Sequence, residues 1–401
     1  MAKKKANTDD FYKDIAAATG GISLTDAGNV PYFINTGSLA LNYICSGRFI
    51  NGGIPGGRIT EFYGPPATAK SLLGYSCLAA VQRMDGIAVL LDCERAGSAD
   101  FAHDAGHVDC DKLITYEPVS IEQVEAKLIA ATRAIRKYYG PEKPILFVWD
   151  SIGVTPTERE WKEVDLPENP TAADIKKAGG NARPGERAKA SGDLLRKINP
   201  FMNEQNATMF IINQTRKNIG VLYGNPETTP GGGEALKFYA SCRLRTSIGK
   251  YIENKTGLPL GINLNFANKK SRSFVPGIKT TGVQLFFQHG INPLGGLLSI
   301  LLQAGRIEKY AAGRYRVLEP WADGQEITFQ AKVADNDVPL DLLLRAPQII
   351  DAKDEREVQA YLNLFEGAIQ LATGDSIVEK VVTDEDSPDF INELQADSDD
   401  E

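Results

Sequence analysis

The stretch Arg58-Ile-Thr-Glu-Phe-Tyr-Gly64-Pro-Pro-Ala-Thr-Ala-Lys70-Ser71 decides the fold of this chain. Residues 58–63 have the pattern of a strand and residues 70–84 that of a helix, so the turn between them is a strand–loop–helix junction. The turn fits the pattern G-x-x-x-x-G-K-[ST], except that Ala69 stands where the second glycine is expected. For this degenerate motif alone, a junction without any ligand stays open.

The chemistry of the turn suits a phosphate group. Its backbone N–H groups can point at phosphate, helped by the positive end of the following helix. A lysine in this position meets the β- and γ-phosphates, and the hydroxyl beside it meets Mg²⁺. The candidate nucleotide-binding residues are therefore Gly64, Pro65, Pro66, Ala67, Thr68, Ala69, Lys70 and Ser71.

The alternation of strands and helices continues along the chain. Further apolar strands are expected at residues 87–92, 145–150 and 209–213, and helices at 121–138 and 188–205. Continuous apolar strands that alternate with helices of this length indicate a mostly parallel sheet covered on both faces. The predicted fold class is therefore α/β.

Polar residues stand at the ends of three of these strands: Glu94, Asp150 and Gln214. Ligand-contacting residues of an open α/β sheet gather beyond the carboxyl ends of its strands. Asp150 fits the role of a carboxylate that reaches Mg²⁺ through a water molecule. Glu94 fits the role of a carboxylate that activates a water, and Gln214 could sense the γ-phosphate. Each alone could equally be a cap or a turn residue. Together they favour a catalytic site whose candidate residues are Glu94, Lys70 and Gln214.

Composition and charge bound the class of protein. The 401 residues suggest two or three folding units. The net charge is −8, but residues 383–401 hold nine acids and no base, so the rest of the chain stands at +1. An acidic total of this kind does not argue against nucleic-acid binding.

Other sequence signals exclude several alternatives. An apolar run of membrane-spanning length is absent, and the basic N-terminus lacks the apolar segment of a secretory signal, so we expect a soluble, unexported, cytoplasmic protein. The five cysteines contain no C-x-x-C pair and are expected to be buried thiols. His103 and His107 resemble a zinc-protease string but have Asp in place of Glu and a glycine between them, so zinc is set aside. Trp149 is expected in the core.

Two polar, glycine- or proline-containing segments interrupt the pattern, at residues 158–187 and 218–234. Segments of this length inside a compact domain are usually functional loops or are mobile. The predicted organisation is an N-terminal arm at 1–35 with a helix at 8–20, a core at 36–290, a smaller α/β domain at 291–382 and a disordered acidic tail at 383–401.

At this point the sequence closely resembles the RecA family of ATP-dependent DNA strand-exchange proteins. The resemblance covers about residues 8–310. It rests on residues 35–42, 57–64 and 210–216, and above all on Asn218-Ile-Gly-Val-Leu-Tyr-Gly-Asn-Pro-Glu-Thr-Thr-Pro-Gly-Gly-Gly233. Ala69 and the stretch Lys270-Ser-Arg-Ser273 resemble the phage UvsX branch, so a bacterial or a phage-infected host cell is implied.

The resemblance implies a RecA-type P-loop core that uses ATP and Mg²⁺. It implies filaments on single-stranded DNA that pair with a homologous duplex and exchange strands, in recombination and repair. Glu94 would act as general base, Ser71 and Asp150 would serve the metal, and Phe101 would stack on adenine. Lys269 and Lys270 would reach the ATP of a neighbouring subunit. Single-strand-binding and mediator proteins are implied partners, and a membrane is not.

Two loops of the family bind DNA. Residues 216–234 match the second loop, and residues 158–187 occupy the place of the first, where a solvated surface insertion stays open. The candidate DNA-binding residues are Arg216, Lys217, Asn218, Gly220, Leu222, Tyr223, Gly231, Gly232, Gly233, Lys176, Lys177, Arg183 and Arg187. Their composition suits sequence-blind binding of single strands.

Two other functions stay open on the sequence. The first is an ATP-binding DNA filament protein with little hydrolysis, because Ala69 impairs the loop. The second is a ring-forming hexameric helicase on the same core. The acidic tail either regulates DNA binding by electrostatic competition or only improves solubility.

Overall fold

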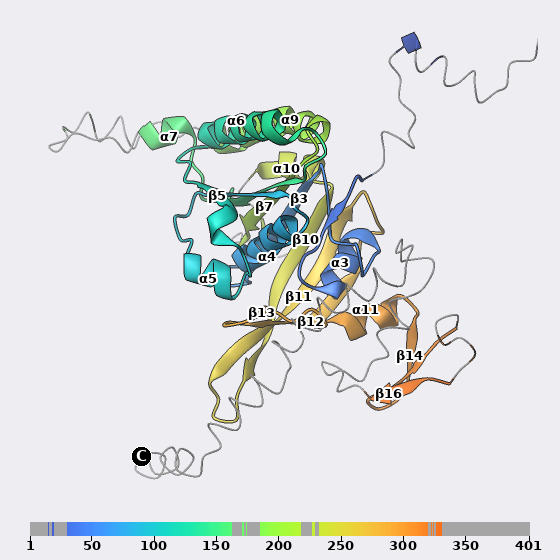
Figure 1. Cartoon of the computed structure of the whole chain (residues 1–401). Coiled ribbons are helices and arrows are strands. Elements are labelled where there is room, and N and C mark those ends of the chain that lie inside the picture. The colour runs from blue at the N-terminus through green and yellow to red at the C-terminus, as the bar shows by residue number, and fades with distance from the viewer. Residues whose placement is uncertain are drawn as a thin grey trace, which may run out of the picture.

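The computed structural model in Figure 1 describes most of the chain up to residue 330. The described residues are 30–162, 185–217, 227–228, 232–319 and 326–330, with the single positions 15, 18, 19, 171, 174, 322 and 324. The predicted acidic tail, most of the predicted arm with its helix at 8–20, and the part of the predicted smaller domain beyond residue 330 lie outside these ranges.

A nine-stranded sheet forms the centre of the molecule, in the order β13-β12-β11-β10-β3-β7-β6-β4-β5. Its parallel part consists of β3 (Ile59–Gly64), β4 (Ile87–Asp92), β5 (Leu113–Tyr116), β6 (Ile145–Asp150), β7 (Ala207–Gln214) and the start of β10 (Cys242–Glu253). Antiparallel strands β11 (Pro259–Ser271), β12 (Lys279–Phe286) and β13 (Gly290–Ile291) complete it. The parallel strands all end at the same edge.

Helices cover both faces of the parallel part, as predicted. The face that carries Phe62, Phe210 and Val148 packs in one buried cluster with α4 (Lys70–Arg83) and α3 (Leu39–Ser46). The opposite face, with Ile211 and the fully buried Trp149, packs against α6 (Ile121–Tyr139), α9 (Glu186–Glu204) and α10 (Gly233–Tyr239). The alternation follows from the period of two along a strand. The α/β class and the core position of Trp149 are thereby confirmed.

Smaller elements lie around this core. They are β1 (Phe33–Ile34) paired with β2 (Ile54–Pro55), α5 (Ala99–Asp104), the 3-10 turn η1 (Cys110–Lys112), α7 (Glu158–Lys162), β8 (Arg216–Lys217) paired with β9 (Glu227–Thr228), α11 (Leu297–Gln303), and a sheet of β14 (Ile307–Ala311), β15 (Arg314–Val317) and β16 (Thr328–Gln330). Within the described part of the chain, no helix is both long and apolar enough to cross a membrane.

The segment 158–187, which interrupts the periodic pattern of the sequence, begins with α7 at Glu158 and ends in α9, which starts at Glu186. The ends of the glycine-rich segment form a two-residue antiparallel ladder, β8 with β9. Leu297, Ile300 and Ile307 of the predicted C-terminal domain belong to the same buried cluster as α3 and α4. The boundary at residue 290 stays a prediction.

Candidate nucleotide-binding site

The loop between β3 and α4 is held close to the neighbouring strand. A Cβ atom on Gly64 would lie 2.5 Å from the hydroxyl oxygen and 2.6 Å from the carbonyl oxygen of Thr246 on β10. A side chain at position 64 would therefore displace β10 or the loop. The first glycine of the motif is required by this approach of two strands.

Ala69 adopts a backbone conformation that favours glycine. Its φ is 54°, in the left-handed region, and it is the residue immediately before α4. Ala67 is also left-handed, with a φ of 57°. For an alanine this conformation costs about 1–2 kcal/mol. The loop therefore places an alanine in a conformation that glycine adopts freely, and the backbone at Ala69 is strained.

Lys70 lies inside the curl of this loop. Its Nζ donates hydrogen bonds to the carbonyl of Pro65 at 2.6 Å and to the hydroxyl of Thr68 at 3.1 Å, and that hydroxyl donates to the same carbonyl at 2.8 Å. Burial lowers the pKa of Lys70 to about 8, although Asp150 and Glu94 act in the opposite direction. A desolvated amine of this kind gains more from a phosphate than an exposed one does.

The polar residues at the strand ends meet beside the loop. The carboxylate of Glu94 accepts hydrogen bonds from the side-chain amide of Gln214 at 3.0 Å and from the hydroxyl of Ser151. Burial raises the pKa of Asp150 to about 6; a hydrogen bond with the Ser71 side chain opposes this shift, and the negative charge of Glu94 adds to it. The structure thus brings together Glu94, Asp150, Gln214, Lys70 and Ser71. Their chemical roles stay predictions.

Sequence reasoning missed the buried Asp92. Its carboxylate accepts backbone N–H groups from Arg95 at 2.7 Å and from Gly97 at 3.0 Å. It therefore shapes the turn that presents Glu94. An aspartate at the end of an apolar strand, five residues before a glycine, is the signal that could have revealed it.

Phe101 lies on α5, next to the helix that follows the loop. Its ring meets that of Tyr75 on α4 edge to face, with 6.2 Å between the centroids, and the residue is 41% exposed. An exposed aromatic face beside the loop suits adenine stacking, which stays a prediction.

Lys269 and Lys270 lie on β11, which β10 separates from β3. Lys269 is exposed. The amine of Lys270 donates to the carbonyls of Lys237 at 2.6 Å and Phe238 at 2.7 Å, near the C-terminus of α10. Burial lowers the pKa of Lys270, and the charges of Arg272 and Arg243 act in the same direction. A role at the ATP of another subunit stays a prediction.

The structure places some of the predicted DNA-binding residues. Arg216 is exposed and directly follows the site. Gly232 and Gly233, both with positive φ, begin α10. Arg187 contacts the carboxylate of Glu160 on α7 at 3.1 and 3.3 Å. The structure describes the backbone of Lys217, while Lys176, Lys177, Arg183, Asn218, Gly220, Leu222, Tyr223 and Gly231 lie outside the described residues.

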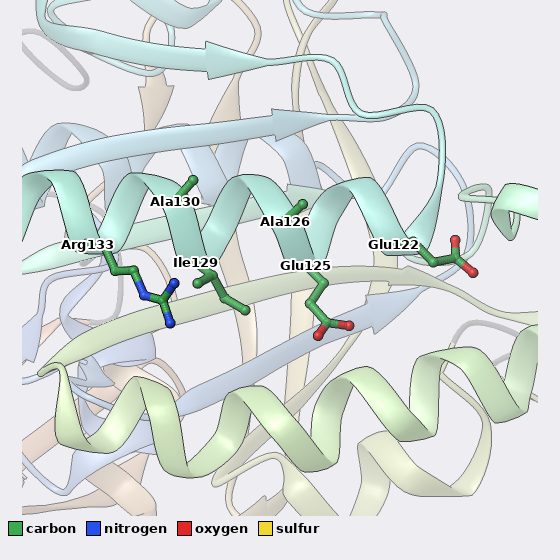
Figure 2. Close-up of a pocket in the computed structure, with 6 residues that line it drawn as sticks. All are labelled: Glu122, Glu125, Ala126, Ile129, Ala130 and Arg133. Atoms are coloured by element: carbon green, nitrogen blue, oxygen red, sulfur yellow. The ribbon is translucent and has the colours of Figure 1, made fainter.

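A shallow hollow of about 410 Å³ lies elsewhere, along α6. Figure 2 shows its lining residues: Glu122, Glu125, Ala126, Ile129, Ala130 and Arg133. Glu125 also contacts Lys197 of α9 at 3.0 Å. Three of the lining residues are apolar and three are charged.

The fold and the loop define a P-loop nucleotide-binding protein on a mostly parallel sheet. The family model described as the RecA N-terminal domain matches residues 21–135 and 169–292, and the chain belongs to the RecA family. It is 28% identical to Protein RecA of Thermus aquaticus over 371 residues, which are 88% of this chain and 98% of that protein.

Two further relatives support the same assignment. The chain is 32% identical to Protein RecA of Chlorobaculum tepidum over 293 residues, 73% of this chain and 76% of the relative. It is 30% identical to Protein RecA of Thermus thermophilus over 336 residues, 81% and 88% of the two chains. The resemblance to the UvsX branch stays a prediction.

Proposed function

We propose that this member of the RecA family is an ATP-dependent DNA recombinase that forms filaments on single-stranded DNA and exchanges strands with a homologous duplex. One observation carries the proposal. Glu94, placed to activate a water, is hydrogen-bonded to Gln214, and the chain continues from Gln214 into the segment 216–234. A nucleotide at the loop and a DNA strand on that segment would therefore act on the same pair of side chains.

The residues of the site suit ATP with Mg²⁺. Ser71 and Asp150 offer a hydroxyl and a carboxylate that already lie within hydrogen-bonding distance, and Mg²⁺ prefers oxygen ligands. When bound, the metal would neutralise charge on the β- and γ-phosphates. Lys70 would exchange its bonds to Pro65 and Thr68 for phosphate oxygens.

Hydrolysis needs a base beside the γ-phosphate. Glu94 would take a proton from the attacking water, and its bonds to Ser151 and Gln214 hold the carboxylate in one orientation. A γ-phosphate that drew the Gln214 amide away from Glu94 would move the start of the segment 216–234. Nucleotide state and DNA binding are coupled in this way.

Self-assembly would use surfaces that one subunit leaves uncovered. The predicted arm helix carries apolar Phe11, Ile15 and Ala18 at helical spacing, and Ile15 is 50% exposed. The hollow on α6 includes the apolar side chains of Ala126, Ile129 and Ala130. A head-to-tail contact between the arm of one subunit and the core of the next need not close into a ring, and a contact that does not close produces a helical filament.

ATP hydrolysis, measured with and without oligothymidylate, tests the proposal. We expect hydrolysis to be stimulated by the oligonucleotide and abolished in Lys70→Ala. Glu94→Ala should still bind ATP and remain on DNA. The matched control is Glu117→Ala, which removes an exposed carboxylate that contacts Arg95 at 3.6 Å. Unchanged turnover in Glu94→Ala would exclude it as the general base.

Negative-stain microscopy with single-stranded DNA and ATP separates the alternatives. Filaments together with stimulated hydrolysis support the proposal. Filaments without hydrolysis in either condition would indicate an ATP-binding filament protein, and closed rings would indicate a helicase. Protein that stays unassembled with and without nucleotide would refute all three.

A further inference from the structure

Glu61 is a fully buried carboxylate in the middle of β3. It stands three residues before Gly64, the first residue of the phosphate-loop motif. Its side chain has no exposure to solvent. One oxygen accepts a hydrogen bond from the Asn213 side-chain amide at 2.9 Å, and the other is paired with the guanidinium of Arg243. Glu61 therefore joins β3 to both of its neighbours, β7 and β10.

A charge in this place needs these partners. Taking a carboxylate out of water is unfavourable unless an opposite charge and hydrogen bonds replace the lost hydration. Arg243 is itself held in place, because its guanidinium lies over the ring of Tyr63 at 4.7 Å. The three side chains form one satisfied network within the sheet, and a network of this kind restricts the positions of the groups attached to it.

The network leads directly to the candidate site. The side-chain oxygen of Asn213 accepts the backbone N–H of Gln214 at 3.0 Å, while its amide nitrogen donates to Glu61. The Gln214 side chain in turn donates to Glu94. Asn213 thus links Glu61 to the backbone of Gln214, which contacts the proposed base and stands two residues before the segment 216–234.

The other end of the network lies on β10 (Cys242–Glu253), which follows α10 (Gly233–Tyr239) in the chain, and α10 begins where the segment 216–234 ends. Arg243 on β10 is the register partner of Lys270 on β11. Lys270 and Arg272 donate hydrogen bonds to the last carbonyls of α10, those of Lys237 and Phe238. The segment therefore starts beside Asn213 and ends in a helix held beside Arg243.

We infer that Glu61 is a positioning residue. Through Asn213 and Arg243 it fixes the strands from which the segment 216–234 leaves and to which it returns. DNA bound to the segment therefore sets the orientation of the Gln214 side chain relative to Glu94. The inference rests on the proposed function and concerns the regulation of the same site. Glu61 itself does not touch the nucleotide.

Asn213→Asp tests this network with a minimal change. The new carboxylate can still accept the N–H of Gln214, but it loses the donor to Glu61 and repels it. We expect the stimulation of ATP hydrolysis by oligothymidylate to fall about 10- to 100-fold, since small displacements in a site have effects of this size. The KM for ATP without DNA should change less than about threefold, because the loop is untouched.

A buried asparagine elsewhere provides the matched control. Asn292 is also fully buried; its amide donates to Gln284 at 2.7 Å and its oxygen accepts the N–H of Leu294 at 3.0 Å. Asn292→Asp should leave the stimulation unchanged, whatever it does to thermal stability. The double variant E61Q/N213D exchanges amide and carboxylate between the two positions, remakes the hydrogen bond, and should recover at least about half of the stimulation.

The outcomes separate this inference from the proposed function. Wild-type protein without any stimulation by DNA would overturn the proposed function. If DNA stimulates hydrolysis by the wild-type protein and stimulates Asn213→Asp equally, the positioning role alone is overturned. The same conclusion follows if Asn213→Asp loses the stimulation and the double variant does not recover it. If Asn213→Asp does not fold, Arg243→Lys keeps the charge but removes the planar guanidinium, and the same loss of stimulation with an unchanged KM is expected.

Discussion

Replacing Ala69 by glycine tests whether the loop is strained or defective. Ala69 is left-handed, with a φ of 54°, so glycine relieves about 1–2 kcal/mol of backbone strain. Glycine also gains freedom in the unfolded chain, which costs about 0.4–1 kcal/mol. From the middle of the two ranges, the free energy of unfolding should therefore rise by about 0.8 kcal/mol. Hydrolysis should change less than about threefold, because the loop already has a conformation that glycine adopts freely.

Ala130→Gly is the control, since it carries the same change in the unfolded chain. Ala130 is exposed in the interior of α6, where glycine should cost about 1 kcal/mol. Thermal unfolding followed by circular dichroism should move the midpoint upward by about 1–3 °C for Ala69→Gly and downward by about 2–4 °C for Ala130→Gly. If both midpoints fall alike, the strain argument is wrong. A large gain in hydrolysis for Ala69→Gly would instead support the hypothesis of an impaired loop.

Three further outcomes follow from the site. The pKa of Lys70 is about 8 in the folded protein and 10.5 for the free side chain, so the unfolded chain binds more protons between these two pH values. The free energy of unfolding should therefore rise with pH from about 8 to 10.5. Urea unfolding should show this rise in the wild-type protein and not in Lys70→Met. The pKa of Asp150 is about 6, so this carboxyl becomes ionised, as a metal ligand must be, between about pH 5 and 7. Calorimetry should show the affinity for Mg²⁺–nucleotide rising over the same range. The rise should be absent in Asp150→Asn. Affinity for oligothymidylate should fall linearly on a log–log plot against salt, and Arg216→Ala should reduce the slope by about 1; an affinity independent of salt would contradict the assignment of the segment 216–234.

The elements that carry the site could be predicted because their signals are local. The apolar runs at 58–63, 87–92, 145–150 and 209–213 agree with β3, β4, β6 and β7 to within two residues. Parallel strands end at one edge, so the meeting of Glu94, Asp150 and Gln214 also followed from the pattern. The structure added the strain at Ala69, which no composition reveals.

Other elements carried no such signal. All eight residues of α3 are buried, so its sequence lacks the amphipathic period by which a surface helix is recognised. The long hairpin of β10 and β11 is polar along much of its length and contains register shifts, which obscure the alternation of a strand. The turn that presents Glu94 depends on Asp92, whose role is visible only in its contacts with backbone N–H groups.

The sequence by itself determined the class of fold, the phosphate loop and the residues at the strand ends, because each is written in consecutive residues with a fixed spacing. Only the tertiary structure decided how these parts are joined. Glu61 meets Asn213 across 152 positions and Arg243 across 182. No local pattern distinguishes a glutamate inside an apolar strand from an exposed one; the order of strands in the sheet places its two partners beside it, and that order is settled by packing.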